Sequence, residues 1–346
     1  MHNGSVQTRL CPNCPLCGSF GNILYRSLSD RIFGAPGVWD MKKCGDLNCG
    51  TLWLDPMPVE ADLAKLYANY YTHEIVASPL RGGPLSTFLA RVRAAHLKIR
   101  YGYGSSPLGW TEKLLGLMTY LHPVWKDALE ASVFYLPIKS GGRLLEVGCG
   151  SGLGLQLMQK NGWSVTGVDF DLGAVDAARG KGLDVRHGQL SALAFADESF
   201  DAVVMSHVIE HVPSPIELLR ECRRVLKDNG VVIALTPNAK SRGHRRYARH
   251  WRGLEPPRHL QIFTEESLAG VASRAGFNVV KTFTSMNGFV YQDLASADLA
   301  ARGAHIMNAR VAMVRRILSH MKGLGLGWLH VLVPGRGEEV VLVARK

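Results

Sequence analysis

The sequence predicts an α/β protein: a doubly wound, mainly parallel sheet, preceded by a small cysteine-rich module and a helical region. From about Gly142 onward, short apolar runs alternate with helical stretches, a pattern typical of parallel strands joined by helices. A glycine-rich loop, GCGSGLG, follows the first of these runs. In addition, five of the seven cysteines lie in the first 50 residues.

The early cysteines predict a structural zinc site in a module spanning residues 1–56. CPLCG and CGDLNCG each place two thiols a few residues apart, with a glycine after the second. Such turn-flanked pairs can converge on one tetrahedral ion, as in a zinc ribbon, and four thiolates close the site. Unrelated reduced thiols are the alternative, and Cys11 could replace one member of the set. The predicted ligands are Cys14, Cys17, Cys44 and Cys49.

Residues 57–138 are predicted to form a helical linker or cap. PVEADLAKLYANYY has the pattern of a helix, and PLSTFLARVRAAHLKIRYGYG is a basic amphipathic stretch. RVAMVRRILSHMKGLGLGWLHVLV, near the other end of the chain, has a similar character. Helices of this kind usually pack on the main domain, which is the interpretation we favour. Contact with an anionic bilayer is the alternative.

Residues 139–346 are predicted to contain the alternating strands and helices. Strand signals are short apolar runs rich in Val, Leu and Ile, and helix signals are longer amphipathic stretches that end at glycine. The expected strands are 143–148, 163–170, 183–188, 200–208, 231–237 and 338–346, and the expected helices are 153–162, 172–182 and 215–230.

The loop LLEVGCGSGLG favours a ligand close to the backbone, because it follows a strand and opens a helix. A P-loop needs a lysine that is absent here, and a dinucleotide fingerprint needs a third glycine where Leu153 stands. Glu146, two residues before the loop, would face a ligand ammonium group better than a phosphate. Asp169 ends the next strand, at the usual place for a ribose-binding acid.

These motifs resemble those of the class I S-adenosylmethionine-dependent methyltransferases. The matching segments are LLEVGCGSGLG, VTGVDFD, ALAFADESFDAVVMSHVIEHV and PPRHLQIFTEESLAGVASRAGF, in this order. The resemblance implies a seven-stranded Rossmann-like sheet and S-adenosyl-L-methionine as cofactor. The subgroup that the chain looks most like also has an amino-terminal CPxCG zinc module. Its members are often associated with methylating glycans, lipid-linked sugars, quinones or other small molecules.

The resemblance also implies a set of cofactor-binding residues. Glu146 would bind the methionine amino group, the glycines would admit its backbone, and Asp169 would bind the ribose hydroxyls. Gln189 stands where many relatives have aspartate, and its amide could still accept a hydrogen bond from the adenine amino group. The full set is Glu146, Gly148, Gly150, Gly152, Asp169, Phe170, Gln189, Leu190 and Ser206.

Catalytic residues are expected at the strand ends near the glycine loop. For a hydroxyl acceptor, the enzyme must align the nucleophile and remove its proton. In related methyltransferases a Glu-His pair after the fourth strand often borders the substrate, which implies Glu210 and His211; a helix-capping pair is the alternative. We also expect a direct role for His259, with a hydrogen-bonded structural histidine as the alternative.

The basic stretch 239–259 is predicted to be a substrate lid, because it follows the fifth strand at the carboxyl edge of the sheet. It contains seven basic residues and one acidic residue, and residues 78–125 contain six and one. Together these segments account for the whole net charge of +11, which points to an anionic surface or ligand. A solvated basic loop is the alternative. The predicted substrate-binding residues are Trp251, Arg258 and Arg246.

The sequence therefore predicts an S-adenosylmethionine-dependent methyltransferase that acts on a small-molecule or glycan-type acceptor. Lipid-linked and anionic acceptors are included, and O-methylation is favoured. An RNA methyltransferase and a non-catalytic cofactor-binding scaffold are the alternatives. The sequence contains neither a signal-like start nor an apolar run of about 18 residues, so a cytoplasmic protein is expected. The prediction includes a cytoplasmic protein that contacts the inner face of the membrane peripherally.

Overall fold

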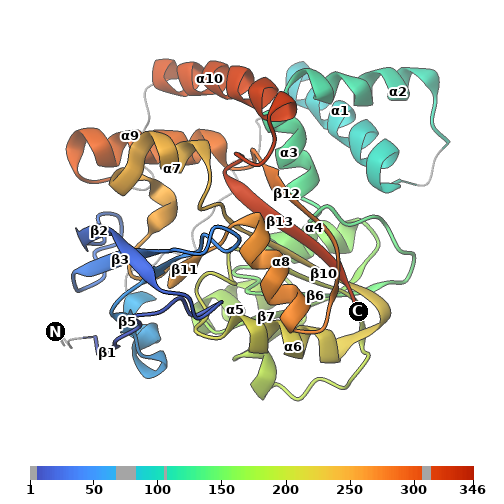
Figure 1. The fold of residues 1–346 in the computed structure, drawn as a ribbon. Coiled ribbons are helices and arrows are strands. Elements are labelled where there is room, and N and C mark those ends of the chain that lie inside the picture. Colours follow the sequence, from blue (N-terminus) through green and yellow to red (C-terminus); the bar gives the residue numbers. More distant parts are fainter. Residues whose placement is uncertain (1–5, 68–82, 105–106, 306–312) are drawn as a thin grey trace. The chain divides into compact units, whose positions relative to one another are not determined.

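The computed structural model describes residues 6–67, 83–104, 107–305 and 313–346 (Figure 1). The chain divides into two compact units. The first, which we call the ribbon-containing unit, comprises residues 1–70, 207–220 and 234–344. The second, which we call the glycine-loop unit, comprises residues 71–206, 221–233 and 345–346.

A seven-stranded sheet has the strand order β12-β13-β10-β9-β6-β7-β8. β6 pairs in parallel with β7 and with β9, and β7 pairs in parallel with β8. The predicted fold class, a mainly parallel Rossmann-like methyltransferase sheet, is therefore confirmed. The strands are β6 (Arg143–Val147), β7 (Ser164–Asp169), β8 (Val185–His187), β9 (Phe200–Ser206), β10 (Leu226–Pro237), β12 (Asn278–Ser285) and β13 (Glu339–Arg345).

Strands β6 and β9 form the core of the glycine-loop unit. The neighbours Leu144 and Leu145 point to opposite faces of the sheet, yet both are fully buried, as are residues 202–205 of β9. Such continuous apolar runs are typical of parallel strands that are covered on both faces. The helices of this unit are α1 (Pro84–Tyr101), α2 (Trp110–Leu117), η2 (Met118–Leu121), α3 (Pro123–Ala131), α4 (Leu153–Lys160), α5 (Leu172–Arg179) and η3 (Leu190–Ala192).

Helix α6 (Pro215–Val225) ends at Val225, so the predicted end at Gly230 was wrong. The carbonyls of Arg224 and Val225 accept hydrogen bonds from the backbone amides of Glu198 and Ser199, at 3.1 and 2.8 Å. These carbonyls are therefore turned away from the next helical turn. The chain then passes directly into β10, with Asn229 in the left-handed region at a φ of 60°.

The amino-terminal module is a small β structure that includes a strand from much later in the chain. A four-stranded sheet has the order β11-β4-β3-β2, and β11 pairs with β4 in antiparallel register (Figure 1). β11 follows the predicted lid by one residue, so the lid is anchored to the cysteine module. The elements are β1 (Thr8–Arg9), β2 (Gly21–Leu28), β3 (Trp39–Cys44), β4 (Leu52–Leu54), β5 (Met57–Pro58), η1 (Glu60–Tyr67) and β11 (Gln261–Ile262).

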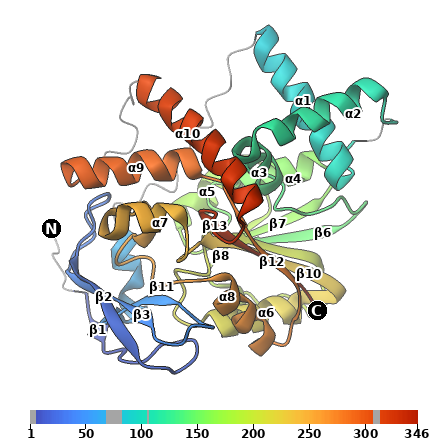
Figure 2. The same ribbon diagram turned by 45° about the horizontal axis from the view of Figure 1, so that its top comes forward.

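The remaining helices of the ribbon-containing unit lie in and after the predicted lid. α7 and α10 both pack beside α9, as Figure 2 shows. Thr264 caps α8 and also donates its hydroxyl to the carbonyl of Cys49 at 2.7 Å, a second link to the cysteine module. The helices are α7 (Arg242–Tyr247), η4 (Ala248–His250), η5 (Arg252–Leu254), α8 (Glu265–Arg274), α9 (Phe289–Arg302) and α10 (Met313–Leu332).

Within the described ranges, every helix is too short or too polar to cross a membrane.

Candidate functional site

The glycine-rich loop of the glycine-loop unit takes a backbone path that other residues rarely adopt. Gly148, Gly150 and Gly152 have φ values of 70°, 52° and 79°. At Gly152, which precedes α4, an added Cβ atom would lie 2.3 Å from a Leu183 methyl carbon. The left-handed backbone and this contact together exclude a side chain at Gly152. Gly152 is buried, whereas Gly148 and Gly150 are partly exposed and leave the backbone accessible at the end of β6.

Glu146 is buried at the end of β6, and one of its carboxylate oxygens lacks a hydrogen-bond donor. It is 6% exposed, and Oε2 has no partner among the described residues. A Cβ atom added to Gly154 would lie 2.7 Å from Oε1, so the start of α4 passes closely over the carboxylate. Burial and the nearby Asp169 raise the pKa of Glu146 to about 8. A ligand ammonium group would supply the missing donor and favour the ionised carboxylate.

Asp169, at the end of β7, ties the glycine loop to the start of the next helix. Its Oδ2 atom accepts from the amide of Gly150 at 2.8 Å, and Oδ1 accepts from the amide of Asp171 at 2.9 Å. Burial raises the pKa of Asp169, and the two amide bonds oppose that shift. Each oxygen keeps a second lone pair that can accept from a hydroxyl.

The other predicted cofactor-binding residues differ in exposure. Phe170 is half exposed, Gln189 is exposed and Leu190 is buried at the start of η3. Ser206 is partly buried at the end of β9. The exposed ring of Phe170 is available to lie against a planar base. The roles of all four residues stay predictions.

In the ribbon-containing unit, Glu210 lies at the centre of a buried polar cluster. It is 0% exposed and accepts from Thr236 Oγ1 at 3.0 Å and from His207 Nδ1 at 3.2 Å. His207 also contacts Glu339 Oε1 through Nε2 at 3.0 Å. Desolvation alone would lower the pKa of His207, but its hydrogen bonds to Glu210 and Glu339 raise it well above the usual value. Burial would raise the pKa of Glu210, but His207 lowers it to about 2.

His211 and His259 both present a ring nitrogen to Glu210. His211 Nδ1 lies 3.0 Å from the carbonyl of Arg258, and His259 Nδ1 lies 2.8 Å from the carbonyl of Gly253. Because a carbonyl can only accept, we assign the proton to Nδ1 in both rings, and Nε2 bears a lone pair. The hydroxyl of Tyr67, which lies 3.0 Å from His211 Nδ1, then acts as a second acceptor. The two Nε2 atoms lie 4.0 and 3.9 Å from Glu210 Oε1. Burial lowers the pKa of His259 to about 4, so this ring is neutral near pH 7.

Arg258 is fixed by two carboxylates. It is 1% exposed, and it pairs with Asp30 at 2.8 Å and with Glu255 at 2.9 Å. Glu255 also pairs with Arg252 and lies 3.7 Å from His259 Nε2. Arg258 therefore holds the backbone carbonyl that orients His211, and it connects the lid to the loop after β2.

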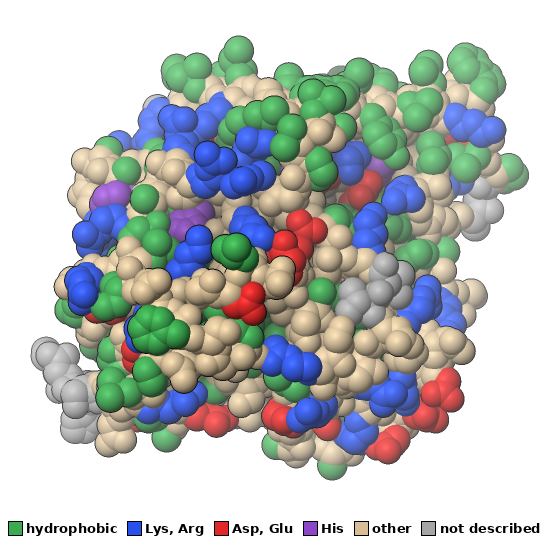
Figure 3. All heavy atoms as spheres, in the orientation of Figure 1, with side chains coloured by type: hydrophobic (Ala, Val, Ile, Leu, Met, Phe, Trp, Pro, Cys, Tyr) green, Lys and Arg blue, Asp and Glu red, His purple; other side chains and the backbone are tan. Residues whose placement is uncertain are grey.

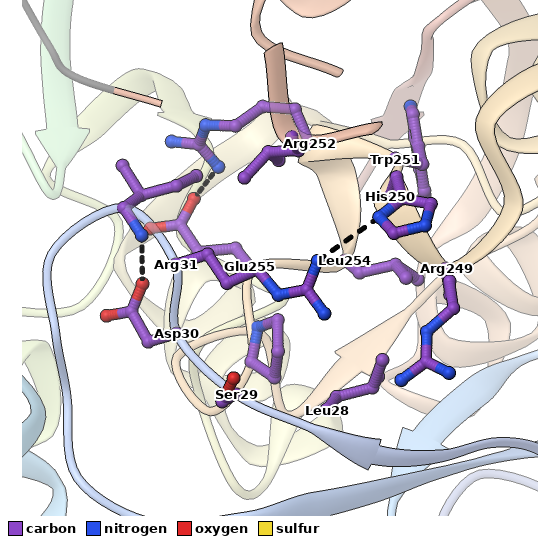
Figure 4. Close-up of a pocket in the computed structure, with 13 residues that line it drawn as sticks. Leu28, Ser29, Asp30, Arg31, Arg249, His250, Trp251, Arg252, Leu254 and Glu255 are labelled. Atoms are coloured by element: carbon purple, nitrogen blue, oxygen red, sulfur yellow. Dashed lines mark hydrogen bonds and ion pairs between the residues drawn. The ribbon is translucent and has the colours of Figure 1, made fainter. Parts of the chain in front are cut away.

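A small cavity that opens to solvent lies between that loop and the lid (Figure 4). Arg31 reaches across it to His250, with 3.3 Å between Nη1 and Nδ1. Trp251 lines the cavity but is 1% exposed, and its ring stacks on His244 with 5.0 Å between centroids. Arg246 is exposed on α7, at a different cavity. Substrate contacts of Trp251, Arg246 and Arg258 stay predictions.

The four cysteines chosen from the sequence converge on one point. Their sulfur atoms all lie within 4.8 Å of one another. Cys14 Sγ lies 3.8 Å from Cys49 Sγ, and Cys17 Sγ lies 3.4 Å from Cys44 Sγ. Zn–S bonds of ~2.3 Å in a tetrahedron separate the sulfurs by about 3.8 Å, so the set fits a zinc ion. Cys11 lies outside the cluster, and its sulfur contacts the carbonyl of Asn13.

Comparison with known proteins identifies the family. The methyltransferase domain family matches residues 119–282. A protein of Mycolicibacterium smegmatis named "Probable S-adenosylmethionine-dependent methyltransferase" is 33% identical over 50% of this chain and 64% of its own length. A ubiquinone biosynthesis O-methyltransferase of Cereibacter sphaeroides is 33% identical over 51% of this chain and 74% of its own length. The chain belongs to the S-adenosylmethionine-dependent methyltransferases.

The solved structure of a SAM-dependent methyltransferase of Thermotoga maritima is also similar, with a TM-score of 0.45. It is 20% identical, and the match covers 68% of this chain and 96% of that one. The methyltransferase described here spans less than two thirds of the Mycolicibacterium relative.

The structure of this methyltransferase reveals two residues whose contacts the sequence did not indicate, Glu255 and Gly154. Glu255 pairs with Arg252 and Arg258 and also lies close to His259. In the sequence analysis it was counted only for its negative charge. The sequence does contain a reason to single out Glu255, because it is the single acidic residue in 239–259. Gly154 lies against Glu146. Its signal in the sequence is that it continues the alternating glycines of the loop by one step.

Replacing Asp30 with alanine should lower the free energy of unfolding by about 3–5 kcal/mol, because the buried Arg258 loses one of its two carboxylates. Burial raises the pKa of Asp30, but Arg258 outweighs burial, and the net pKa is lowered. The contribution should therefore be present above pH ~4 and disappear as the pH falls through the folded-state pKa. Urea unfolding at pH 7 measures it.

Asp176→Ala is the matched control, because Asp176 and Arg179 form an exposed pair with 4.0 Å between the charged atoms. We expect a change of less than about 0.5 kcal/mol for this control. If Asp30→Ala cost no more than Asp176→Ala, the Asp30–Arg258 contact would not stabilise the fold.

Proposed function

We propose that this protein transfers the methyl group of S-adenosyl-L-methionine to an oxygen atom of a small-molecule or glycan-type acceptor. The observation that carries the proposal is the buried carboxylate of Glu146 beside the glycine-rich loop, because its Oε2 atom has no donor among the residues that the structure describes. A buried acceptor without a partner is costly, and such a group is typical of a site that waits for a ligand. The ammonium group of the cofactor supplies the chemistry that fits it.

The glycine-loop unit would hold the cofactor through three features. Glu146 binds the amino group, the backbone around Gly150 and Gly152 lies against the methionine portion, and Asp169 accepts from the ribose hydroxyls. When bound, the cofactor supplies an electrophilic methyl group on a sulfonium. The carboxylate of Glu146 then replaces water as the neighbour of the ammonium group, and the proton that it carries in the free protein is released.

The Glu210–His211–His259 cluster would remove the acceptor proton. His211 is the member we assign as the general base, because its side chain is 15% exposed whereas those of His259 and Glu210 are 5% and 0% exposed. Its Nε2 lone pair can take a hydroxyl proton while Nδ1–H stays on the Arg258 carbonyl. Glu210 then stabilises the imidazolium, and His207 keeps Glu210 ionised.

The acceptor class is argued from the relatives and from charge. The Cereibacter relative is named as an O-methyltransferase of ubiquinone biosynthesis, which supports oxygen as the methylated atom. The lid carries seven basic residues, which supports an anionic or lipid-linked acceptor. Arg246 and Trp251 are the residues we propose for acceptor contact, and we propose His259 as a neutral neighbour of the reacting group.

Methyl-labelled cofactor tests this function directly. The purified protein is incubated with separate lipid, polysaccharide, small-molecule and RNA fractions of cells. We expect label in a lipid, polysaccharide or small-molecule fraction, in an ether linkage that survives mild base. Label in RNA alone would replace this function by the RNA alternative, and cofactor binding without transfer to any fraction would favour a scaffold.

We also propose one structural zinc ion per chain, bound by Cys14, Cys17, Cys44 and Cys49. Elemental analysis should find about one zinc per chain, and Cys17→Ser should lose it, because three thiolates bind the ion less tightly. Cys222→Ser is the control, since Cys222 is buried in α6 away from the cluster. A folded wild-type protein without zinc would refute the site.

A further inference from the structure

Helix α10 turns its large apolar side chains toward solvent. Met313 and Leu332 are each 77% exposed, and Met321 is 66% exposed. At 100° per residue these positions fall on one side of the helix. An ordinary surface helix buries its apolar face and exposes its polar face, and α10 does the opposite. The exposed apolar residues are Met313, Val314, Ile317, Leu318, Met321, Leu324, Trp328, Leu329, Val331 and Leu332.

Polar contacts on the opposite face fix this orientation. Ser319, Gly323, Gly327 and His330 are the buried residues of α10. Ser319 donates its hydroxyl to Asp293 of α9 at 3.1 Å, and His330 Nε2 lies 3.0 Å from the carbonyl of Thr284. Rolling the helix to bury its apolar face would break these contacts. The apolar face is therefore a stable surface of the molecule.

The surface next to α10 is strongly basic. Residues 313–337 and 239–254 contain no acidic side chain. Helices α7, α9 and α10 line a cavity that opens to solvent. Its positively charged lining residues are Arg242, Arg245, Arg246 and Lys322. Figure 3 shows hydrophobic side chains along the edge where Figure 1 places α10, with Lys and Arg side chains directly below them.

Among the described residues, the carboxylates that line this cavity are Asp293, which is fully engaged, and Glu338, whose Oε1 is engaged and whose buried Oε2 has no partner. Asp293 pairs with Lys322 and accepts from Tyr247 at 2.6 Å, and Glu338 is 1% exposed and accepts from the amide of Gly243 at 3.0 Å. No carboxylate pairs with Arg245 or Arg246 among the described residues. The Nε atom of Arg242 is buried, and it too has no partner in the described part of the chain. Within the described part of the chain, Arg245 and Arg246 thus lack a carboxylate partner, and Arg246 lies over the ring of Tyr247 with 5.5 Å to the ring centroid, so both can meet an anion.

We propose that α10 lies in the surface of an anionic lipid bilayer, with the α7–α10 cavity holding the phosphate of a lipid headgroup. A bulky apolar face beside a basic surface is the pattern of an interfacial helix, and the charge is complementary to anionic headgroups. A second copy of the chain fits less well, because a twofold interface would bring like arginines together. The docking itself does not depend on the proposed function. Only its consequence rests on that function, namely that a docked enzyme would meet lipid-linked acceptors.

Sedimentation with lipid vesicles tests the docking surface. The full chain with its zinc is mixed with vesicles of phosphatidylcholine alone or with 30% phosphatidylglycerol. We expect at least tenfold tighter binding to the anionic vesicles, weakening as salt is added. Leu318→Glu with Met321→Glu should lower the affinity at least tenfold. Arg245→Glu with Arg316→Glu should do the same, because Arg316 is an exposed basic residue of α10 itself. Leu47→Glu, at an 89% exposed position of the cysteine module, should change it less than twofold.

Three results would overturn the proposal. They are equal binding to both vesicle types, unchanged binding by both double variants, and a dimer in light scattering that Leu318→Glu with Met321→Glu converts to a monomer. Circular dichroism confirms that the variants are folded. Cofactor affinity is measured in parallel: vesicle binding without cofactor binding would refute only the proposed function, and cofactor binding without vesicle binding would refute only the docking surface.

Discussion

Replacing Glu146 with glutamine should weaken the binding of S-adenosyl-L-methionine roughly ten- to a hundredfold. The buried carboxylate would lose a charge-assisted hydrogen bond to the ligand ammonium group, which is worth about 1.5–3 kcal/mol. Titration calorimetry measures the affinity. Glu217→Gln is the control, because the side chain of Glu217 is 66% exposed on α6, and its affinity should stay within twofold of the wild type.

The pH dependence of cofactor binding is a second test of the role of Glu146. In the free protein the pKa of Glu146 is about 8, because of burial and Asp169, so the group is protonated at pH 7. Binding of an ammonium group ionises it and releases the proton. Wild-type affinity should therefore rise with pH between 6 and 8, by up to about tenfold per unit, and level off above pH 8. Glu146→Gln should show no such slope.

Calorimetry at pH 7 in two buffers of different ionisation enthalpy counts the released proton directly. We expect a number approaching one for the wild type and zero for Glu146→Gln. The variant should also be the more stable protein at pH 8 without cofactor. A carboxyl whose pKa is raised by folding costs stability as the pH rises from its unfolded-state pKa of ~4.5 to its folded-state pKa of about 8. Wild-type binding without proton release would remove Glu146 from the amino-group site.

Replacing His211 with alanine should lower the methyl-transfer rate constant by about 10²–10⁴-fold, the usual contribution of a general base. Cofactor affinity should stay within twofold, because His211 has no assigned contact with the cofactor. Imidazole added to the reaction should restore part of the activity, since the side chain of His211 is partly exposed and its removal leaves room for the free base.

His320→Asn serves as a control for loss of a histidine elsewhere, because His320 is exposed on α10. Its rate should match the wild type with a water-soluble acceptor. If His211→Ala kept full activity, or if added imidazole had no effect at any concentration, the proton would have to leave by another route, and the capping interpretation of Glu210 and His211 would stand.

Local patterns in the sequence were sufficient for six of the seven strands of the main sheet, all but β12, and for the clustering of the four cysteines. Parallel strands that are buried on both faces need continuous apolar runs, and Leu144 with Leu145 carry that signal without reference to any distant residue. The cysteine set followed from two turns with a glycine after each pair. Glu146 was predicted as a cofactor-binding residue from its position before the glycine loop. Only the structure could show that one of its buried oxygens lacks a partner among the described residues.

Features that depend on distant pairing could not be predicted in the same way. The sequence placed Arg258 at the acceptor, and nothing near it in the chain indicates that Asp30 will neutralise it. The apolar residues of α10 have the spacing of a helix that packs on a core. This spacing shows that they share one face of the helix, but it does not show whether that face meets the core. The end of α6 was misplaced because the residues that bind its last carbonyls, Glu198 and Ser199, lie outside the helix.

The pairing of β4 with β11 has a consequence for how the chain is made. The ribosome completes Leu54 roughly two hundred residues before Gln261 emerges. Until then the cysteine module has an unpaired strand edge, and Asp30 has no arginine partner. We therefore expect the module to bind its metal early. Its sheet would be completed only later, when the lid and β11 have been synthesised. A truncated chain that stops before residue 261 should expose that edge and tend to aggregate.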